Sequence, residues 1–207
     1  MYTTKKLLLL LVLFANSFTL FAQCPDPSND STPPTAVCQD ITVQLDANGT
    51  VSITAADIDG GSSDNCGIAS LNATISSFDC GDLGANTVSL FVIDTNGNAA
   101  GCTATVTVVD IIDPVIADMP DSQTLNVIAT TCSAVATWTA PTASDNCSVT
   151  LTSSHDSGDT FPVGSTTVTY TATDGSGNET QDTFTVTVTD NEDPVIADCP
   201  ADITQDS

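Results

Sequence analysis

The sequence predicts an all-β fold made of tandem β-sandwich repeats. Apolar and polar side chains alternate along residues 167–173, where Val168, Tyr170 and Ala172 fall on one face and threonines on the other. Residues 184–188 alternate in the same way. Alternation with period two is typical of half-buried β-strands, and short strands separated by glycine-rich turns favour a sandwich. No segment has the pattern of a helix.

The second observation is an internal repeat of 80 residues. TVSLFVIDTNGN (87–98) matches TVTYTATDGSGN (167–178), and DPVIADM (113–119) matches DPVIADC (193–199) at the same offset. A fixed period of this length indicates repeated structural units. We therefore predict a linker over 23–34, a first repeat over 35–110, a second over 111–190, and the start of a truncated third repeat over 191–207.

Strands are expected wherever the alternation recurs between turn residues. The first repeat offers five such segments and the second offers five more. The segments are ITVQLD, TVSIT, SLNATIS, TVSLFVID and ATVTVVD, followed by QTLNVIA, SAVATWTA, VTLTS, TVTYTAT and TFTVTVT.

Residues 1–22 have the features of a secretory signal peptide. Lys5 and Lys6 precede an apolar run over 7–15, and Ala22 ends the segment at the expected cleavage site. The run is shorter than the roughly 20 apolar residues that span a bilayer. Lipidation of Cys24 is disfavoured because Gln23 precedes it. We expect a secreted or cell-surface protein of bacterial origin, without direct membrane insertion.

The charge of the chain is strongly acidic. It has 26 Asp and Glu residues against two lysines, and removal of Lys5 and Lys6 with the signal peptide takes the formal charge from −24 to −26. Nothing then remains to neutralise phosphate, which excludes nucleic acid as a partner. The acidity indicates either a self-repelling soluble surface or cation binding.

Eight cysteines in a secreted chain indicate disulfides. Cys38 and Cys102 of the first repeat are replaced together in the second, by Met119 and Asp182, as expected if they bond to each other. The remaining pairs are then expected to be local, and Cys24 and Cys199 have no evident partner. The predicted bonds are Cys38–Cys102, Cys66–Cys80 and Cys132–Cys147.

Several motifs of the second repeat occur in an order that resembles the hyalin repeat, or HYR domain. They are SAVATWTAPTASDNC (133–147), FPVGSTTVTYTATDGSGN (161–178), FTVTVTD (184–190) and DPVIADCPADI (193–203). The resemblance implies an immunoglobulin-like β-sandwich in an extracellular, often adhesive protein, and it supplies no catalytic residue. The first repeat is a divergent relative, which keeps SDNC (63–66) but has no WTAP motif.

The residues themselves give little support to an enzyme. His155 is the one histidine, and the first repeat has Phe78 at the matching place, so a structural role is favoured. Trp138 on an alternating strand is interpreted as a core residue, the alternative being an exposed ring that stacks on a sugar. No catalytic residue is predicted.

Acidic residues crowd the two links that follow the repeats. A calcium ion prefers six to eight oxygen ligands, and VTDNEDP resembles the calcium-binding interdomain linker of cadherins. The alternative is an ordinary solvated turn, and Asp57, Asp59 and Asp64 could add ligands. Calcium is thus the one cofactor expected, at Asp110, Asp113, Asp190, Glu192 and Asp193.

Taken together, the sequence predicts a non-catalytic extracellular adhesion module, or a stalk that holds a binding tip away from the surface. Its expected partners are a surface ligand, protein or glycan, and further repeats of the same chain. Two alternatives stay open. One is a carbohydrate-binding accessory region, and the other is the stalk of a larger secreted enzyme whose catalytic domain lies beyond residue 207.

Overall fold

The computed structural model describes residues 24, 28–127 and 131–193. This part of the chain is all-β apart from one short 3-10 helix, η1 (Cys80–Asp82). The strands are β1 (Ile41–Gln44), β2 (Thr50–Ser52), β3 (Ile68–Ala73), β4 (Ser77–Asp79), β5 (Gly84–Asp94), β6 (Ala99–Val109), β7 (Val115–Ala117), β8 (Gln123–Asn126), β9 (Ser133–Val135), β10 (Thr142–Ser144), β11 (Val149–Ser153), β12 (Thr160–Pro162), β13 (Gly164–Asp174) and β14 (Glu179–Thr189).

The chain divides into two compact units. Of the described residues, the first comprises 24, 28–40, 54–75 and 87–104, and the second comprises 41–53, 76–86, 105–127 and 131–193. The strands β5 and β6 contribute residues to both units, so the units do not coincide with the two sequence repeats.

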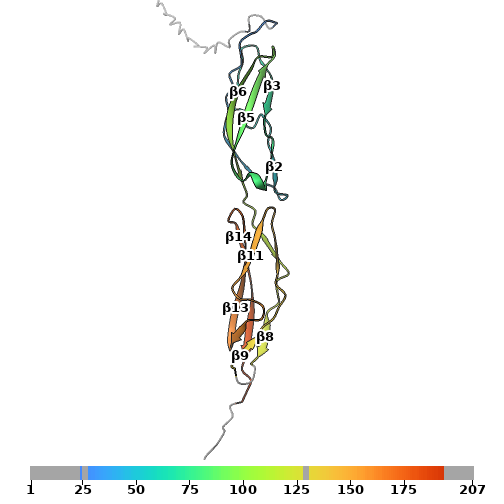
Figure 1. Cartoon of the computed structure of the whole chain (residues 1–207), viewed down its shortest axis with the longest axis vertical. Helices are drawn as coiled ribbons and strands as arrows, with labels where there is room; N and C mark the ends of the chain where they lie inside the picture. The colour runs from blue at the N-terminus through green and yellow to red at the C-terminus, as the bar shows by residue number, and fades with distance from the viewer. Residues whose placement is uncertain (1–23, 25–27, 128–130, 194–207) are drawn as a thin grey trace, which may run out of the picture. The chain divides into compact units, whose positions relative to one another are not determined.

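In the first unit, β3 pairs in antiparallel register with β5, from Ile68 opposite Asp94 to Ala73 opposite Leu90 (Figure 1). Alternate residues of β5 are buried, which gives this unit an apolar face that includes Val88, Leu90 and Val92. The alternation that predicted the strand is therefore the alternation that forms the core.

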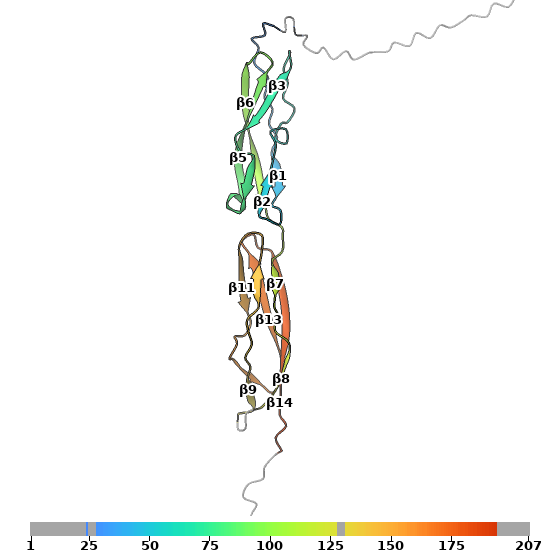
Figure 2. The same cartoon turned by 90° about the vertical axis from the view of Figure 1, so that its right-hand side faces the viewer.

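The second unit contains a β-sandwich formed by residues 115–189. Four strands lie in the order β11-β13-β14-β8, and the short pairs β12-β9 and β10-β7 complete this sandwich (Figure 2). The long hairpin β13-β14 pairs Val168 with Phe184. The apolar face predicted for this hairpin is buried, and it packs with Ala134, Ala136 and Phe161 from the short strands.

The outer strands β1 and β8 pair in parallel with β6 and β14, respectively. Ile41 lies opposite Val106 in the first pair, and Gln123 lies opposite Val186 in the second. Both parallel pairs belong to the second unit, and they repeat one arrangement at matching places of the sequence repeat.

Trp138 packs against the core of this sandwich. Its ring centroid lies 5.0 Å from that of Phe184 and 6.1 Å from that of Phe161. Its indole Nε1 donates a hydrogen bond of 2.7 Å to the Tyr170 hydroxyl oxygen. The interpretation of Trp138 as a packing residue is confirmed, and this ring is not a free platform for sugar stacking.

The structure contains the predicted strands with different first or last residues, and it contains four short strands that were not predicted. The segment 133–140 was expected to be one strand, but only Ser133–Val135 forms β9, so Trp138 follows the strand instead of lying on it. The missed strands β4, β7, β10 and β12 have three residues each. Three residues are too few to show an alternation of period two.

The disulfides differ from the predicted set. Cys38 bonds to Cys102, with Cα atoms 5.8 Å apart, as the sequence predicts. Cys66, however, bonds to Cys24, and Cys80 bonds to Cys147. Cys132 is exposed and free, so its predicted bond to Cys147 is wrong. The prediction kept these partners within one repeat, whereas the fold brings each SDNC cysteine to a segment that precedes its repeat.

The predicted signal peptide and most of the third repeat, with Cys199, lie outside the described residues. Among the residues that are described, no helix has the length and apolar character needed to cross a membrane.

Candidate metal centres

Two clusters of three aspartates form the candidate sites. Cluster 1 consists of Asp30, Asp64 and Asp94, and cluster 2 of Asp110, Asp145 and Asp174. In each cluster one carboxylate oxygen from every residue lies within 4.8 Å of the other two. Cluster 1 lies within the first unit and cluster 2 within the second.

The clusters are equivalent positions of the sequence repeat. Asp30 and Asp110 are 80 residues apart, as are Asp94 and Asp174, and the aspartates of the two SDNC motifs are 81 apart. Because the repeat places the same three residues together twice, the arrangement is a property of the fold and not of one loop.

Asp94 and Asp174 come from the turns that close the hairpins β5-β6 and β13-β14. Asp174 Oδ1 accepts hydrogen bonds from the backbone N–H groups of Ser176 and Asn178, and its Oδ2 accepts from Asn178 Nδ2 at 2.7 Å. Gly177 adopts φ of +92°, which favours glycine in this turn. Asp94 has the same contacts with Asn96 and Asn98.

These contacts keep Asp94 and Asp174 ionised. Burial alone raises the pKa of each carboxyl, but the hydrogen bonds from the asparagine side chain and from the backbone of the turn outweigh it. The pKa of both carboxyls therefore lies below its ordinary value, and both groups are anionic at neutral pH although they are only 1% and 8% exposed.

Asp30 lies in the linker that precedes the first repeat, and Asp110 lies immediately before the second repeat. Oδ1 of Asp110 accepts hydrogen bonds from the Ile112 N–H at 3.1 Å and from Asn146 Nδ2 at 3.2 Å. Oδ1 of Asp30 accepts from the Thr32 N–H at 2.9 Å. In both residues Oδ2 is buried without a hydrogen-bond partner, and Asp110 is only 6% exposed.

Asp64 and Asp145 belong to the SDNC loops. Oδ2 of Asp145 accepts from the Cys147 N–H, and Oδ2 of Asp64 accepts from the N–H groups of Cys66 and Gly67. The other oxygen, Oδ1, is buried and has no partner in either residue. Each cluster thus holds two carboxylates with one oxygen fixed by the backbone and one oxygen unsatisfied.

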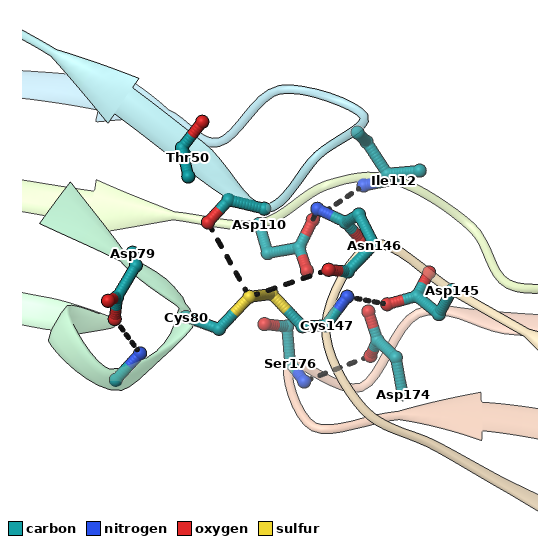
Figure 3. The surroundings of a disulfide bond; sticks show 12 residues. Thr50, Asp79, Cys80, Asp110, Ile112, Asp145, Asn146, Cys147, Asp174 and Ser176 are labelled. Atoms are coloured by element: carbon teal, nitrogen blue, oxygen red, sulfur yellow. Dashed lines mark hydrogen bonds between the residues drawn. A yellow bond between two sulfur atoms is a disulfide. The ribbon is translucent and has the colours of Figure 1, made fainter.

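The Cys80–Cys147 disulfide lies beside cluster 2, as Figure 3 shows. It joins η1 to the loop that carries Asp145. Asn146, between Asp145 and the disulfide, donates to Asp110 Oδ1 and to the backbone oxygen of Asp46. The Oδ1 atom of Asn146 is also buried without a partner.

The predicted calcium ligands are only partly brought together. Asp110 belongs to cluster 2, but Asp113, Asp190, Glu192 and Asp193 are exposed and belong to neither cluster. Of the additional candidates, only Asp64 is a cluster member. The prediction relied on acidic residues that are close in sequence, whereas the clusters are built from a link, a loop and a hairpin turn.

Four cluster residues, Asp30, Asp94, Asp145 and Asp174, were not among the predicted ligands, and Asp64 was named only as an additional candidate. A usable signal was present for four of the six cluster residues, since Asp64 and Asp145 belong to the two SDNC motifs and Asp94 and Asp174 begin the matching turns DTNGN and DGSGN.

Asp57 and Asp59 have a different role, because they fix turns. Oδ2 of Asp57 accepts hydrogen bonds from the N–H and the hydroxyl of Thr54, and Asp59 Oδ1 accepts from the Ser62 N–H. These bonds lower the pKa of Asp57 through Thr54, and that of Asp59 through Ser62.

We expect both carboxyls to titrate below the ordinary aspartate value of about 3.9. Because the folded-state pKa is depressed, the stabilisation is complete above about pH 4 and is lost as the pH falls through the folded pKa. Carboxyl chemical shifts followed by NMR between pH 6 and pH 2 measure this. Midpoints at or above 3.9 would contradict the assigned hydrogen bonds.

His155 lies outside both clusters. Its ring centroid is 5.3 Å from that of Phe161, and its Nδ1 lies 3.0 Å from the Ser154 hydroxyl. That hydroxyl accepts a hydrogen bond from the Thr169 N–H, so Ser154 joins the end of β11 to β13. These contacts are structural, as expected for a position that is occupied by Phe78 in the first repeat.

Comparison with known proteins shows what part of the chain is similar to. Residues 109–188 match the model of the HYR domain. The chain is 51% identical over 83 residues to hyalin of Lytechinus variegatus, a match that covers 39% of this chain and 16% of hyalin. It is 35% identical over 192 residues to hyalin of Strongylocentrotus purpuratus, covering 85% of this chain and 15% of that protein.

A further relative is the rat sushi, von Willebrand factor type A, EGF and pentraxin domain-containing protein 1. It is 39% identical over 98 residues, which are 46% of this chain and 3% of that protein. This chain therefore spans less than a fifth of the length of these relatives. All of them are animal proteins, so the predicted bacterial origin has no support.

Among solved structures, human protocadherin-24 EC1-2 aligns with 79% of this chain and with all of that chain, at 12% identity and a TM-score of 0.38. Drosophila N-cadherin EC1-4 aligns with 78% of this chain and 50% of that chain, at 15% identity and a TM-score of 0.38.

Proposed function

We propose that this chain is an extracellular adhesion or spacer module without catalytic activity. The observation that carries the proposal is the HYR domain over residues 109–188, together with the similarity to hyalin. The three disulfides support an extracellular location, because disulfides persist in oxidising compartments.

The side chains that could support other functions are engaged in the fold. Trp138 is packed between Phe161 and Phe184 and bonded to Tyr170, which leaves it poorly placed for a carbohydrate. The His155 ring lies against Phe161, and its Nδ1 lies 3.0 Å from the Ser154 hydroxyl, which accepts a hydrogen bond from the Thr169 N–H. A general base needs a positioned nucleophile and a group that orients it.

The partner class proposed is a surface ligand, protein or glycan, with further repeats of the same kind in series. The absence of Lys and Arg beyond residue 6 leaves nothing to neutralise an anionic partner. Neutral or basic surfaces are therefore favoured, because like charges across an interface lower the association rate and the affinity.

The test is adhesion of beads coated with the chain. We expect such beads to be retained on a panel of immobilised extracellular-matrix proteins and neutral glycans, above beads coated with an unrelated acidic protein of similar net charge. Equal retention of both beads across the panel would contradict adhesion. Release of sugar or peptide fragments from the panel by the soluble chain would contradict the absence of catalysis.

A further inference from the structure

We propose that clusters 1 and 2 are two calcium-binding sites, each occupied by one Ca²⁺ ion. This inference concerns the chain's own carboxylates, and it stands whether or not the chain adheres to a surface.

Both clusters contain buried carboxylate oxygens that have no hydrogen-bond partner. Asp110 is 6% exposed, and its Oδ2 has no partner, while Oδ1 is held by Ile112 and Asn146. Asp145 Oδ1 is likewise buried and unpartnered. A buried carboxylate oxygen without a partner is costly, since the charged group has lost water and gained nothing in return. A cation at the centre of the cluster would supply the missing partner.

Cluster 1 repeats this arrangement independently of cluster 2. Asp30 Oδ2 and Asp64 Oδ1 are the corresponding atoms, and they too are buried without partners. The hydrogen bonds around them also correspond, because Asn98 Nδ2 donates to the Asp30 backbone oxygen as Asn178 Nδ2 does to that of Asp110. The same atoms are therefore left open in two separate parts of the chain.

The negative charge of each cluster also favours a bound cation. Three carboxylates within 4.8 Å repel one another, and the sequence beyond Lys6 has no lysine or arginine to compensate them. Asn98 Nδ2 and Asn178 Nδ2 donate hydrogen bonds of 2.7 Å to Oδ2 of Asp94 and Asp174, respectively, which fixes the orientation of these two carboxylates. A divalent cation satisfies all three carboxylates at once.

The chemistry and spacing of the ligand atoms indicate which cation would bind. All the candidate ligand atoms are oxygens, which suit hard cations and not zinc or copper. Two oxygens bound to the same Ca²⁺ at about 2.3–2.6 Å are at most about 5 Å apart, which accommodates the observed limit of 4.8 Å. Mg²⁺ demands near-ideal octahedral geometry at about 2.0–2.1 Å and usually keeps several waters, so a cluster of three carboxylates suits Ca²⁺ better. Backbone oxygens and water would complete six to eight ligands.

An ion in cluster 2 would join three segments of the second unit. Asp110 follows β6, Asp145 follows β10, and Asp174 ends β13. Asp190 repeats the place of Asp110 after another 80 residues, and its Oδ1 accepts from the Glu192 N–H at 3.1 Å, as Asp110 Oδ1 does from Ile112.

The test is equilibrium dialysis of the chelator-treated chain against Ca²⁺ in 150 mM NaCl, which screens diffuse counterion binding. We expect two saturable ions per chain, with dissociation constants of at most about 10⁻³ M, as in extracellular calcium modules. Asp110→Asn keeps the shape and the hydrogen-bond acceptor but removes a charge. We expect it to bind one ion, and the double variant Asp30→Asn/Asp110→Asn to bind none.

Asp113→Asn is the matched control, because it removes the same charge from an exposed residue of the same link. It should still bind two ions. Circular dichroism of each variant checks that it is folded. The proposal is overturned if the folded parent chain shows no saturable binding, or if Asp113→Asn loses as much binding as Asp110→Asn.

Discussion

Replacement of both Cys80 and Cys147 by serine is expected to lower the free energy of unfolding of the second unit by roughly 4 kcal/mol. The bond joins residues that are 67 positions apart. A cross-link of that span restricts the unfolded chain strongly, and in the chain-entropy account the stabilisation rises with the logarithm of the loop length. The measurement is urea unfolding followed by the fluorescence of Trp138, the one tryptophan of the chain.

Cys132→Ser is the control for this experiment. Cys132 is exposed and free, so its replacement should leave the unfolding midpoint unchanged. If Cys132→Ser destabilised the protein as much as the double variant does, the local bridge between Cys132 and Cys147 would be favoured over the structure. Peptide mapping under non-reducing conditions identifies the bonded pairs directly.

Phe161→Ala is expected to lower the free energy of unfolding of the same unit by about 3–5 kcal/mol. Phe161 is 1% exposed, and its ring contacts those of Trp138 and His155. Truncation removes buried apolar surface and leaves a cavity in the core of a small sandwich. Urea unfolding with Trp138 fluorescence gives the change, and circular dichroism confirms that the variant is folded before unfolding begins.

Val135→Ala provides the comparison, because Val135 also lies on a strand of this sandwich but is 47% exposed. Its replacement should change the free energy of unfolding by no more than about 0.5 kcal/mol, as for most surface substitutions. Similar losses for the two variants would show that Phe161 does not occupy the core position described.

The sequence was sufficient for the long strands but not for the short ones. Val168, Tyr170 and Phe184 could be assigned to a buried face because β13 and β14 each continue the alternation for 11 residues. Strands such as β10 and β12 have three residues, and their place is set by the partner strand across the sheet. That information is tertiary and leaves little periodicity in the sequence.

The disulfides show a different limit. Cys38 and Cys102 could be paired because both are missing from the second repeat. Cys80 and Cys147 lie in different repeats, so comparing the repeats could not show that they are bonded. The calcium hypothesis met a similar limit, since Asp110 was recognisable from the acidic link, while Asp145 and Asp174 join it only when the loops fold together.

The parallel pairing of β8 with β14 determines how this sandwich would respond to tension. β8 lies near the start of the second repeat and β14 at its end, and the two strands run side by side from Gln123 opposite Val186 to Asn126 opposite Thr189. A pull on the two ends of the repeat drives these strands past each other along their length. All the hydrogen bonds between them are then loaded together in shear, whereas antiparallel strands pulled from one end would unzip one bond at a time. This geometry therefore gives the sandwich resistance to unfolding under tension without any additional contact.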